Sequence, residues 1–540
     1  MTGKVTRLHK RSKKVDWLTK GERRARLADR QEQWTGQWTA LAKAFIEALL
    51  GEEIQELLGR PAHKWGDPGG ATGGSLIQPN PRLTQSAAQY QVLKSLLLLA
   101  LGCYTAFLSV TGEYDGRWSR MLLNRDRALG VMAHYGIDAL LGTTPVNLAY
   151  LSGYRPWLHW FYRLYTTENF MFQSYALFPR DQGTAPALVA PTSLGNLAYQ
   201  AEWPSWIEDV YTFGAPIEME EPKPEYPDRI NELYRIAQLS KQKGSKTPGE
   251  ALVRALTDRG LTKGVVGVDV VGMKPGQLEY ARRELPNVQF KDAGELFRYI
   301  RMAKTAEEVA LLRKSAEINW QGFQALMKAA VPGATELDLV KAHRTGASMN
   351  GGVPAFCNNA CGPWAMNHWE PSDYYALKPG DAVYCDAGCT YQYYHADTNL
   401  SAVLGEPSKR HREVFQAMSD GLSAAETAVR PGVRMSELMG IMKEACLKSG
   451  VIKQFAGFGH AIGLEPRDMP MIQTPWETAR DDFINLSADL PIETGMVFNL
   501  ENAFREIGTG SVAVETTLHV TPTGCERLIP QPREIVILPA

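Results

Sequence analysis

The 540-residue chain is poor in cysteine and in net charge, and each shortage argues against a class of protein. Its seven cysteines are odd in number and scattered, which does not suit a secreted disulfide framework and fits reduced thiols in a cytoplasm. The formal net charge is −1, so nothing global favours a nucleic-acid partner. We therefore expect a cytoplasmic protein that does not bind nucleic acid.

Long apolar runs are also scarce. The uncharged stretch Leu96–Val110 falls short of the roughly twenty residues that a membrane span needs. It lies far from the N-terminus, and no convincing cleavage site of small residues follows it. A buried or interfacial helix is therefore favoured over a membrane anchor, and membrane contact through 96–110 is the lesser alternative.

The first part of the chain carries no recognisable chemistry. Residues 1–30 hold eleven Lys or Arg against three Asp or Glu, which is typical of a solvated arm, with binding to nucleic acid or an anionic membrane as the alternative. Residues 31–58 have apolar side chains at helical spacing, and 66–84 have the Gly, Pro, Asn and Ser content of a linker. We treat 1–115 as an extension with a basic arm and helices, of unassigned role.

Five residues between Val383 and Val520 are the chemical centre of the sequence. Four are carboxylates and one is a histidine, a ligand set that suits Mn, Fe, Co or Zn. They lie in or beside short β-branched or apolar runs, which predict strands that hold ligands rigidly. The alternative is a buried hydrogen-bond network, but unpaired carboxylates in a core are costly. The predicted metal ligands are Asp386, Asp397, His460, Glu501 and Glu515.

The order and spacing of these residues resemble the pita-bread metallopeptidases, which include methionine aminopeptidase, aminopeptidase P, prolidase and creatinase. Ten residues separate the two aspartates, a Gly-His-x-Ile-Gly-Leu segment follows, and Glu515 comes fourteen residues after Glu501. The segment Met302–Thr305, the Pro332–Gly333 turn and the Asn367–His368 pair extend the resemblance over residues 120–540.

The resemblance implies an α/β (α+β) chain with two family domains behind the extension. Residues 116–291 alternate helical and strand patterns and are similar to the creatinase/prolidase N-terminal domain, down to Thr144–Gly153. Residues 292–540 resemble the pseudo-twofold pita-bread catalytic domain, in which Pro-Gly turns at 332 and 431 echo one another. Within the first domain, Asn124–Tyr135 predicts a helix and Ala139–Leu141, Ala176–Phe178 and Gly264–Asp269 predict strands.

The family pattern also implies a role for each ligand. Asp397 and Glu515 would bridge two divalent metal ions, Asp386 would chelate one of them, and His460 with Glu501 would complete the other. Such a pair activates a shared water and polarises the carbonyl that the water attacks. Glu501 is also the candidate proton carrier. The resemblance favours Mn among Mn, Fe, Co and Zn.

His368 and an aromatic cluster are further candidates for the site. His368 corresponds to the family histidine that faces the scissile group, and could donate to a developing oxyanion. Aromatic residues crowd 157–172, where core or subunit contact is the first interpretation and a substrate pocket containing Trp160 and Tyr162 is the alternative. In the family this domain often reaches the active site of another subunit, so a homodimer is expected.

Two departures from the family bear on the substrate. Proline-specific members usually carry a histidine where this chain has Arg467, and they usually have Arg and Asp where it has Ala513 and Thr516. Arg467 stays protonated and cannot shuttle protons at neutral pH. It could instead bind a substrate carboxylate or phosphate, or pair with the adjacent Asp468.

The sequence therefore predicts a dinuclear-metal hydrolase of Xaa-Pro peptides or a related small amide. One alternative is a non-peptidase member of the family, such as a dimethylsulfoniopropionate-type lyase acting on a small carboxylate. Another is a metal-free binding protein, against which the five ligand positions argue. The expected substrate is a short peptide or a small molecule.

Overall fold

The computed structural model describes residues 121–154, 173–192, 205–226, 228–242, 244–363, 371–471, 478–487 and 489–540. The extension 1–115, the aromatic cluster in 157–172 and the Asn367–His368 pair therefore lie outside the described residues, as does the apolar run 96–110. Within the described ranges, no helix has both the length and the apolar character to cross a membrane.

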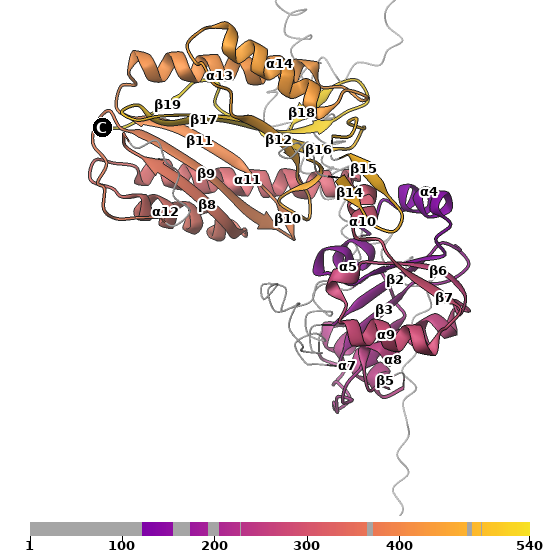
Figure 1. The fold of residues 1–540 in the computed structure, drawn as a ribbon. Coiled ribbons are helices and arrows are strands. Elements are labelled where there is room, and N and C mark those ends of the chain that lie inside the picture. The colour runs from indigo at the N-terminus through magenta and orange to yellow at the C-terminus, as the bar shows by residue number, and fades with distance from the viewer. Residues whose placement is uncertain are drawn as a thin grey trace, which may run out of the picture. The chain divides into compact units, whose positions relative to one another are not determined.

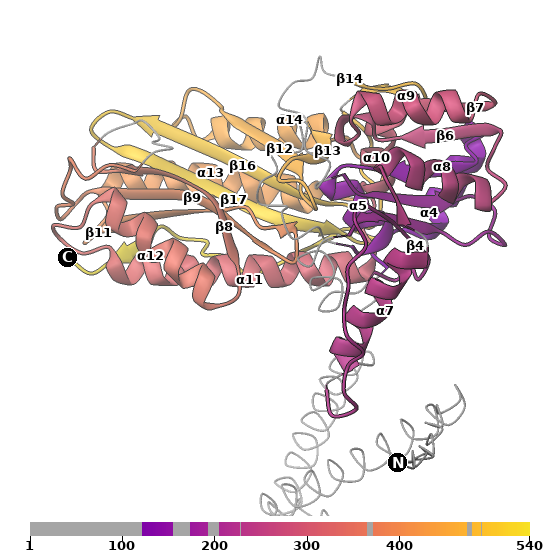
Figure 2. The same ribbon diagram turned by 90° about the horizontal axis from the view of Figure 1, so that it is seen from below.

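A mixed sheet is the core of the first described domain (Figures 1 and 2). Its strand order is β5–β4–β3–β2–β1–β6–β7, with β2 antiparallel to both neighbours and β6 parallel to β1 and β7. The strands are β1 (Ala139–Gly142), β2 (Tyr175–Pro179), β3 (Ala187–Pro191), β4 (Val210–Phe213), β5 (Gly244–Ser245), β6 (Gly264–Val268) and β7 (Val288–Asp292).

Helices cover both faces of this sheet. Successive side chains of a strand point to opposite faces, so Leu140 packs in one core with Leu148 and Leu296, whereas Leu141 packs in another with Leu252. Figure 1 accordingly shows α5 and α10 on one face and α8 and α9 on the other. The helices are α4 (Arg125–Tyr135), α5 (Pro145–Ser152), α7 (Asp228–Gln242), α8 (Pro248–Asp258), α9 (Pro275–Glu284) and α10 (Gly294–Arg301).

The predicted elements of this domain are confirmed. Helix α4 begins after Asn124, whose side chain accepts a hydrogen bond from the Arg127 amide, and it ends at Gly136 with a φ of 67°. Strands β1, β2 and β6 coincide with the three predicted apolar runs to within two residues at either end.

Two helix pairs flank the strands of the second domain (Figure 1). They are α11 (Ala306–Ala329) with α12 (Glu336–Met349), and α13 (Lys409–Ala428) with α14 (Met435–Lys448). The Pro-Gly turns before α12 and α14 have matching backbones, since Gly333 and Gly432 have φ values of 89° and 93°. Only glycine adopts this conformation without strain, so the sequence echo reports a repeated turn in the two halves.

The strands of this domain form two main sheets and a hairpin. The first sheet has the order β10–β9–β11–β19 with β8 paired to β9, and the second has the order β13–β12–β16–β17–β18. The strands are β8 (Val353–Cys361), β9 (Ala382–Tyr391), β10 (Tyr394–His395), β11 (Thr398–Leu404), β12 (Gly457–Ala461), β13 (Asp468–Met471), β14 (Thr478–Arg480), β15 (Asn485–Ser487), β16 (Val497–Glu506), β17 (Gly510–Val520), β18 (Cys525–Arg527) and β19 (Val536–Leu538).

A serine joins the two sheets. The Ser401 hydroxyl on β11 accepts from the Ala513 amide on β17 at 2.7 Å and donates to the Ala513 carbonyl at 2.8 Å. Because both strands continue from this bridge toward predicted metal ligands, Asp397 before β11 is held near Glu515 on β17.

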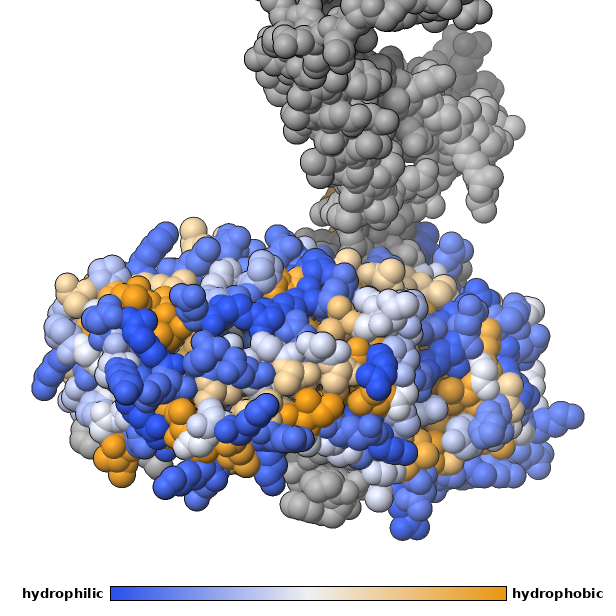
Figure 3. Space-filling model, turned by 90° about the horizontal axis from the view of Figure 1, so that it is seen from above, coloured by the Kyte–Doolittle hydropathy of each residue, from blue (hydrophilic) through white to orange (hydrophobic). Residues whose placement is uncertain are grey.

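On the face drawn in Figure 3, apolar side chains form small groups among charged ones.

Candidate metal centre

Strand register places three of the predicted ligands on one face of the second sheet. Glu501 on β16 pairs with Glu515 on β17, and His460 on β12 pairs with Asn499, two residues before Glu501. Directly paired residues of an antiparallel ladder lie on the same face, as do residues two apart on one strand. His460, Glu501 and Glu515 therefore converge from three neighbouring strands.

The two aspartates approach from the first sheet. Asp386 lies on β9, and Asp397 immediately precedes β11, which pairs with β9. The Asp397 Oδ2 is 3.5 Å from His460 Nε2. Asp397, His460 and Glu515 each offer one ligand atom, and these atoms all lie within 4.8 Å of one another. Three predicted ligands are thus grouped closely enough to hold one metal ion.

The other two carboxylates belong to the same electrostatic cluster. Burial, together with the charge of Asp397, raises the pKa of Glu501 to about 8. Burial, together with the charges of Asp397 and Glu501, also holds the pKa of both Asp386 and Glu515 well above the usual range. The carboxylates oppose one another's ionisation, which is the condition that a divalent cation relieves.

Buried ligand atoms without partners point to the same conclusion. Asp386 Oδ1, His460 Nε2 and Glu515 Oε2 are buried and have no hydrogen-bond partner among the described residues. Leaving such atoms unpaired is costly in a fold without a cation. One histidine nitrogen with carboxylate oxygens is a donor set for Mn, Fe, Co or Zn. The residues present therefore fit a divalent metal.

Sequence reasoning missed the residues that orient these ligands. The Asn499 amide donates to Glu515 Oε1 at 2.8 Å and approaches the Asp397 carbonyl at 3.5 Å, while the Thr517 hydroxyl donates to that carbonyl at 3.3 Å. Such partners fix the orientation of metal-binding side chains. The available signal was spacing, because Asn499 and Thr517 each lie two residues from a ligand and so share its face of the strand.

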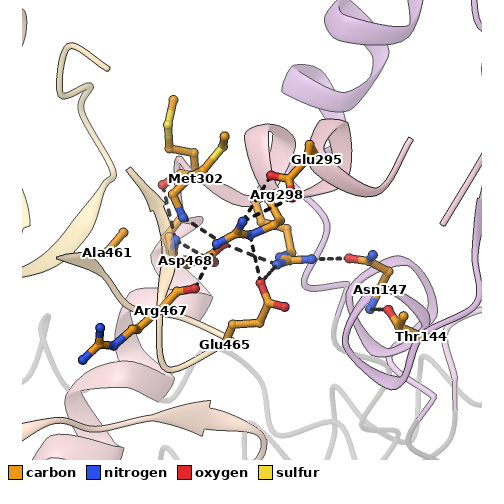
Figure 4. Close-up of polar contacts among 12 residues, drawn as sticks. Thr144, Asn147, Glu295, Arg298, Met302, Ala461, Glu465, Arg467 and Asp468 are labelled. Atoms are coloured by element: carbon orange, nitrogen blue, oxygen red, sulfur yellow. Dashed lines mark hydrogen bonds and ion pairs between the residues drawn. The ribbon is translucent and has the colours of Figure 1, made fainter. Parts of the chain in front are cut away.

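Of the two alternatives for Arg467, pairing with the adjacent Asp468 is not the one that the structure shows, because other cations hold this acid. Asp468 is fully buried and is bonded by Arg301 and Lys304, with both nitrogen–oxygen distances at 3.3 Å. Figure 4 shows Arg467 turned away from these groups. Its guanidinium carbon lies 5.6 Å from the ring centroid of Phe458, the cross-strand partner of Glu501.

Arg467 therefore stands at the edge of the carboxylate cluster. Its charge lowers the pKa of Glu501, against the upward shift from burial and Asp397. Ala513, at the position of the usual family arginine, is instead buried in a small apolar group with Ala360, Tyr384 and Ala503. Three further predicted site residues, His368, Trp160 and Tyr162, lie outside the described part of the chain.

Two family models match the chain in succession. Residues 125–303 match the creatinase/prolidase N-terminal domain, and residues 310–522 match metallopeptidase family M24. The second range contains all five predicted ligands.

Relatives and solved structures agree with these matches. The chain is 25% identical over 282 residues to an Xaa-Pro dipeptidase of Pyrococcus horikoshii, covering 51% of this chain and 77% of that protein. It is 28% identical over 270 residues to an Xaa-Pro dipeptidase of Pyrococcus furiosus, covering 48% and 74%. Its fold matches an X-Pro aminopeptidase of Thermotoga maritima, with a TM-score of 0.54, 20% identity and coverage of 77% and 99%.

Proposed function

Because the chain belongs to the pita-bread metallopeptidases of family M24, we propose that it hydrolyses Xaa-Pro peptides or a related small amide, using two divalent metal ions. As a member of that family it is a metallohydrolase. The observation that carries the proposal is the convergence of Asp397, His460 and Glu515 within 4.8 Å, in a chain similar to Xaa-Pro dipeptidases. The proposed metal ligands are Asp386, Asp397, His460, Glu501 and Glu515.

The residues of the site divide the chemistry among them. Bound metal supplies Lewis-acid activation of a water and of the scissile carbonyl. Asp397 and Glu515 reach the ligand group from different sheets, and both would help to hold the metal. Glu501 holds the proton taken from the attacking water and passes it to the leaving amine. His368 donates a hydrogen bond to the developing oxyanion.

The proposal extends to metal identity, assembly and location. We favour Mn, and we expect about two metal ions per chain. A homodimer in the cytoplasm is proposed on the family pattern, and the six cysteines within the described residues are free, which suits a reducing compartment. Metal analysis of purified protein tests the identity and number of the metal ions, and light scattering tests the homodimer. Protein that contains no metal would favour the alternative of a metal-free binding protein.

A substrate panel tests the reaction itself. Purified protein with added Mn²⁺ is given Xaa-Pro dipeptides, proline-led tripeptides, cyclic amides and betaine-like carboxylates. Release of free proline from a dipeptide supports the proposal. Elimination from a betaine-like carboxylate, with no hydrolysis of any amide, would favour the lyase. Arg467 is compatible with that alternative as well, because it could bind the carboxylate of such a substrate.

Arg467 should select substrates that carry a carboxylate. Arg467→Met should lower kcat/KM for an Xaa-Pro dipeptide by a factor that corresponds to about 1.5–3 kcal/mol, the range for a hydrogen bond to a charged group. The kcat/KM for the dipeptide amide should be nearly unchanged. Arg467→His, by supplying a group that titrates near neutral pH, should raise cleavage of the dipeptide amide, which does not use the carboxylate contact of Arg467.

The matched control for Arg467 is Arg505→Met. Arg505 is also exposed, and its charge also lowers the pKa of Glu501, so it separates the loss of one positive charge from the loss of a specific contact. Equal losses on the dipeptide and its amide in Arg467→Met, or the same loss in Arg505→Met, would show that Arg467 does not bind the substrate carboxylate.

His368 should affect the chemical step but not the metal. His368→Ala should lower kcat by roughly 10²–10³, the usual range for one oxyanion donor, with the metal content of the wild-type protein. Steady-state kinetics on metal-loaded protein is the measurement. An unchanged kcat would assign His368 a structural role.

A further inference from the structure

Three cations on one short segment pair with acids on either side of Arg467, and Figure 4 labels one of them, Arg298. Arg298 and Arg301 lie in the last turn of α10, and Lys304 follows three residues later. Residues spaced by three lie on one side of a helical turn. Their targets lie on either side of Arg467: Glu465 is in the connection between β12 and β13, and Asp468 is the first residue of β13.

Each cation makes a different contact. Arg298 donates to the Arg467 carbonyl at 3.0 Å and lies 3.3 Å from Glu465. Arg301, only 1% exposed, donates to Glu465 at 2.5 Å and to Asp468 at 3.3 Å. Lys304 pairs with the other Asp468 oxygen at 3.3 Å. We call these three residues the cation clamp.

The pairs of Arg301 and Lys304 with Asp468 are buried, whereas Arg298 and Glu465 are partly exposed. Burial alone would raise the pKa of Asp468, but the charges of Lys304, Arg301 and Arg298 hold it at about 2. Arg301 also donates to the Asn147 side chain on α5, so the same guanidinium connects the N-terminal domain to the clamped segment. Removing one partner from a buried ion pair leaves the other charge uncompensated, so this network resists displacement.

The turn held by the cation clamp begins two residues after His460, a proposed metal ligand. Asp468 pairs across the ladder with Ala461, the residue after His460. Between them, a Cβ added at Gly463 would lie 2.9 Å from Asp468 Oδ2 and 3.1 Å from Lys304 Cε, so the turn fits tightly against the clamp. The position of Arg467 is therefore decided by contacts to its backbone and to both flanking acids.

We propose that Arg298, Arg301 and Lys304 are positioning residues that hold the Ile462–Arg467 turn, and thereby keep the Arg467 guanidinium over Phe458, where it selects substrates with a carboxylate. This inference rests on the proposed function, because it needs Arg467 to bind the substrate carboxylate. The clamp does not contact substrate. It acts on specificity through Arg467 alone, which a purely structural ion-pair cluster would not do.

Arg298→Met is the sharpest test, because Arg298 bonds the Arg467 carbonyl and is not the main partner of buried Asp468. Its control is Arg313→Met, since Arg313 likewise donates to a backbone carbonyl, Arg527 O at 3.2 Å, and pairs with an exposed acid, Glu526. We expect Arg298→Met to raise KM for an Xaa-Pro dipeptide about three- to thirtyfold, the scale of coupling between contacting residues. The KM for the dipeptide amide and the kcat should change less than twofold.

The double variant Arg298→Met, Arg467→Met separates positioning from general support. If the clamp acts through Arg467, adding Arg298→Met to Arg467→Met should change KM for the dipeptide by less than twofold. The inference is overturned if the KM increases of the two single variants multiply in the double variant. It is also overturned if Arg298→Met raises KM equally for the dipeptide and its amide.

Hydrogen exchange tests the clamp without any substrate. In Arg298→Met, amides of residues 462–468 should exchange about tenfold faster than in the wild type or in Arg313→Met, because the turn opens more often. Unchanged exchange overturns the inference whether or not Xaa-Pro peptides are cleaved. Faster exchange in a protein that cleaves no Xaa-Pro peptide would support the clamp and contradict the proposed function.

Discussion

Asp397→Ala should abolish measurable turnover and lower bound metal, by a factor larger than the roughly 10–100-fold lost when a supporting residue of a metal site is removed. Asp397 contributes one of the grouped ligand atoms, lies 3.5 Å from His460 Nε2, and raises the pKa of Asp386, Glu501 and Glu515. Asp397 therefore interacts with each of the other four proposed ligands, and its loss should weaken the binding of metal by the whole group.

Metal analysis after dialysis and kcat/KM on an Xaa-Pro dipeptide measure this effect. Asp420→Ala on the exposed side of α13 is the control, and should leave metal content and rate unchanged. If Asp397→Ala kept the metal content and the rate of the wild-type protein, the assignment of the site would be wrong.

Glu501→Gln should have opposite effects on catalysis and on the stability of metal-free protein. The amide keeps the size of the side chain but cannot carry a proton between water and leaving amine, so kcat should fall by roughly 10²–10⁴. In metal-free protein, burial and the charge of Asp397 raise the pKa of Glu501 to about 8, so folding at neutral pH requires this carboxyl to take up a proton. Glutamine is neutral without taking up a proton, so the substitution should raise the free energy of unfolding by about 1 kcal/mol or more.

Urea denaturation with and without a chelator measures the stability part of this prediction. Metal at a hundred times its Kd should raise the free energy of unfolding of the wild-type protein by about 2.7 kcal/mol. The increase should be smaller for Glu501→Gln. The control is Glu506→Gln on the same strand, where the acid pairs with Arg410 at 2.9 Å. That variant should lose stability and keep its activity. A destabilised metal-free Glu501→Gln would identify the cluster as a structural hydrogen-bond network.

The sequence by itself determined the strands that carry the proposed metal ligands. The runs around Asp386, Glu501 and Glu515 were recognisable because apolar and β-branched residues between turn signals are a local property of a strand. They became β9, β16 and β17. The repeated Pro-Gly turn was equally visible, since the need for glycine at a positive φ is met within a few residues of chain.

Only the tertiary structure decided which groups surround those ligands. Arg467 and Asp468 are neighbours in sequence, but β13 begins at Asp468, and successive side chains along an extended chain point to opposite sides. Asp468 therefore faces Arg301, 167 residues away along the chain, while Arg467 faces Phe458. Contacts of such separation depend on how strands and helices pack, and spacing within one segment carries no information about them.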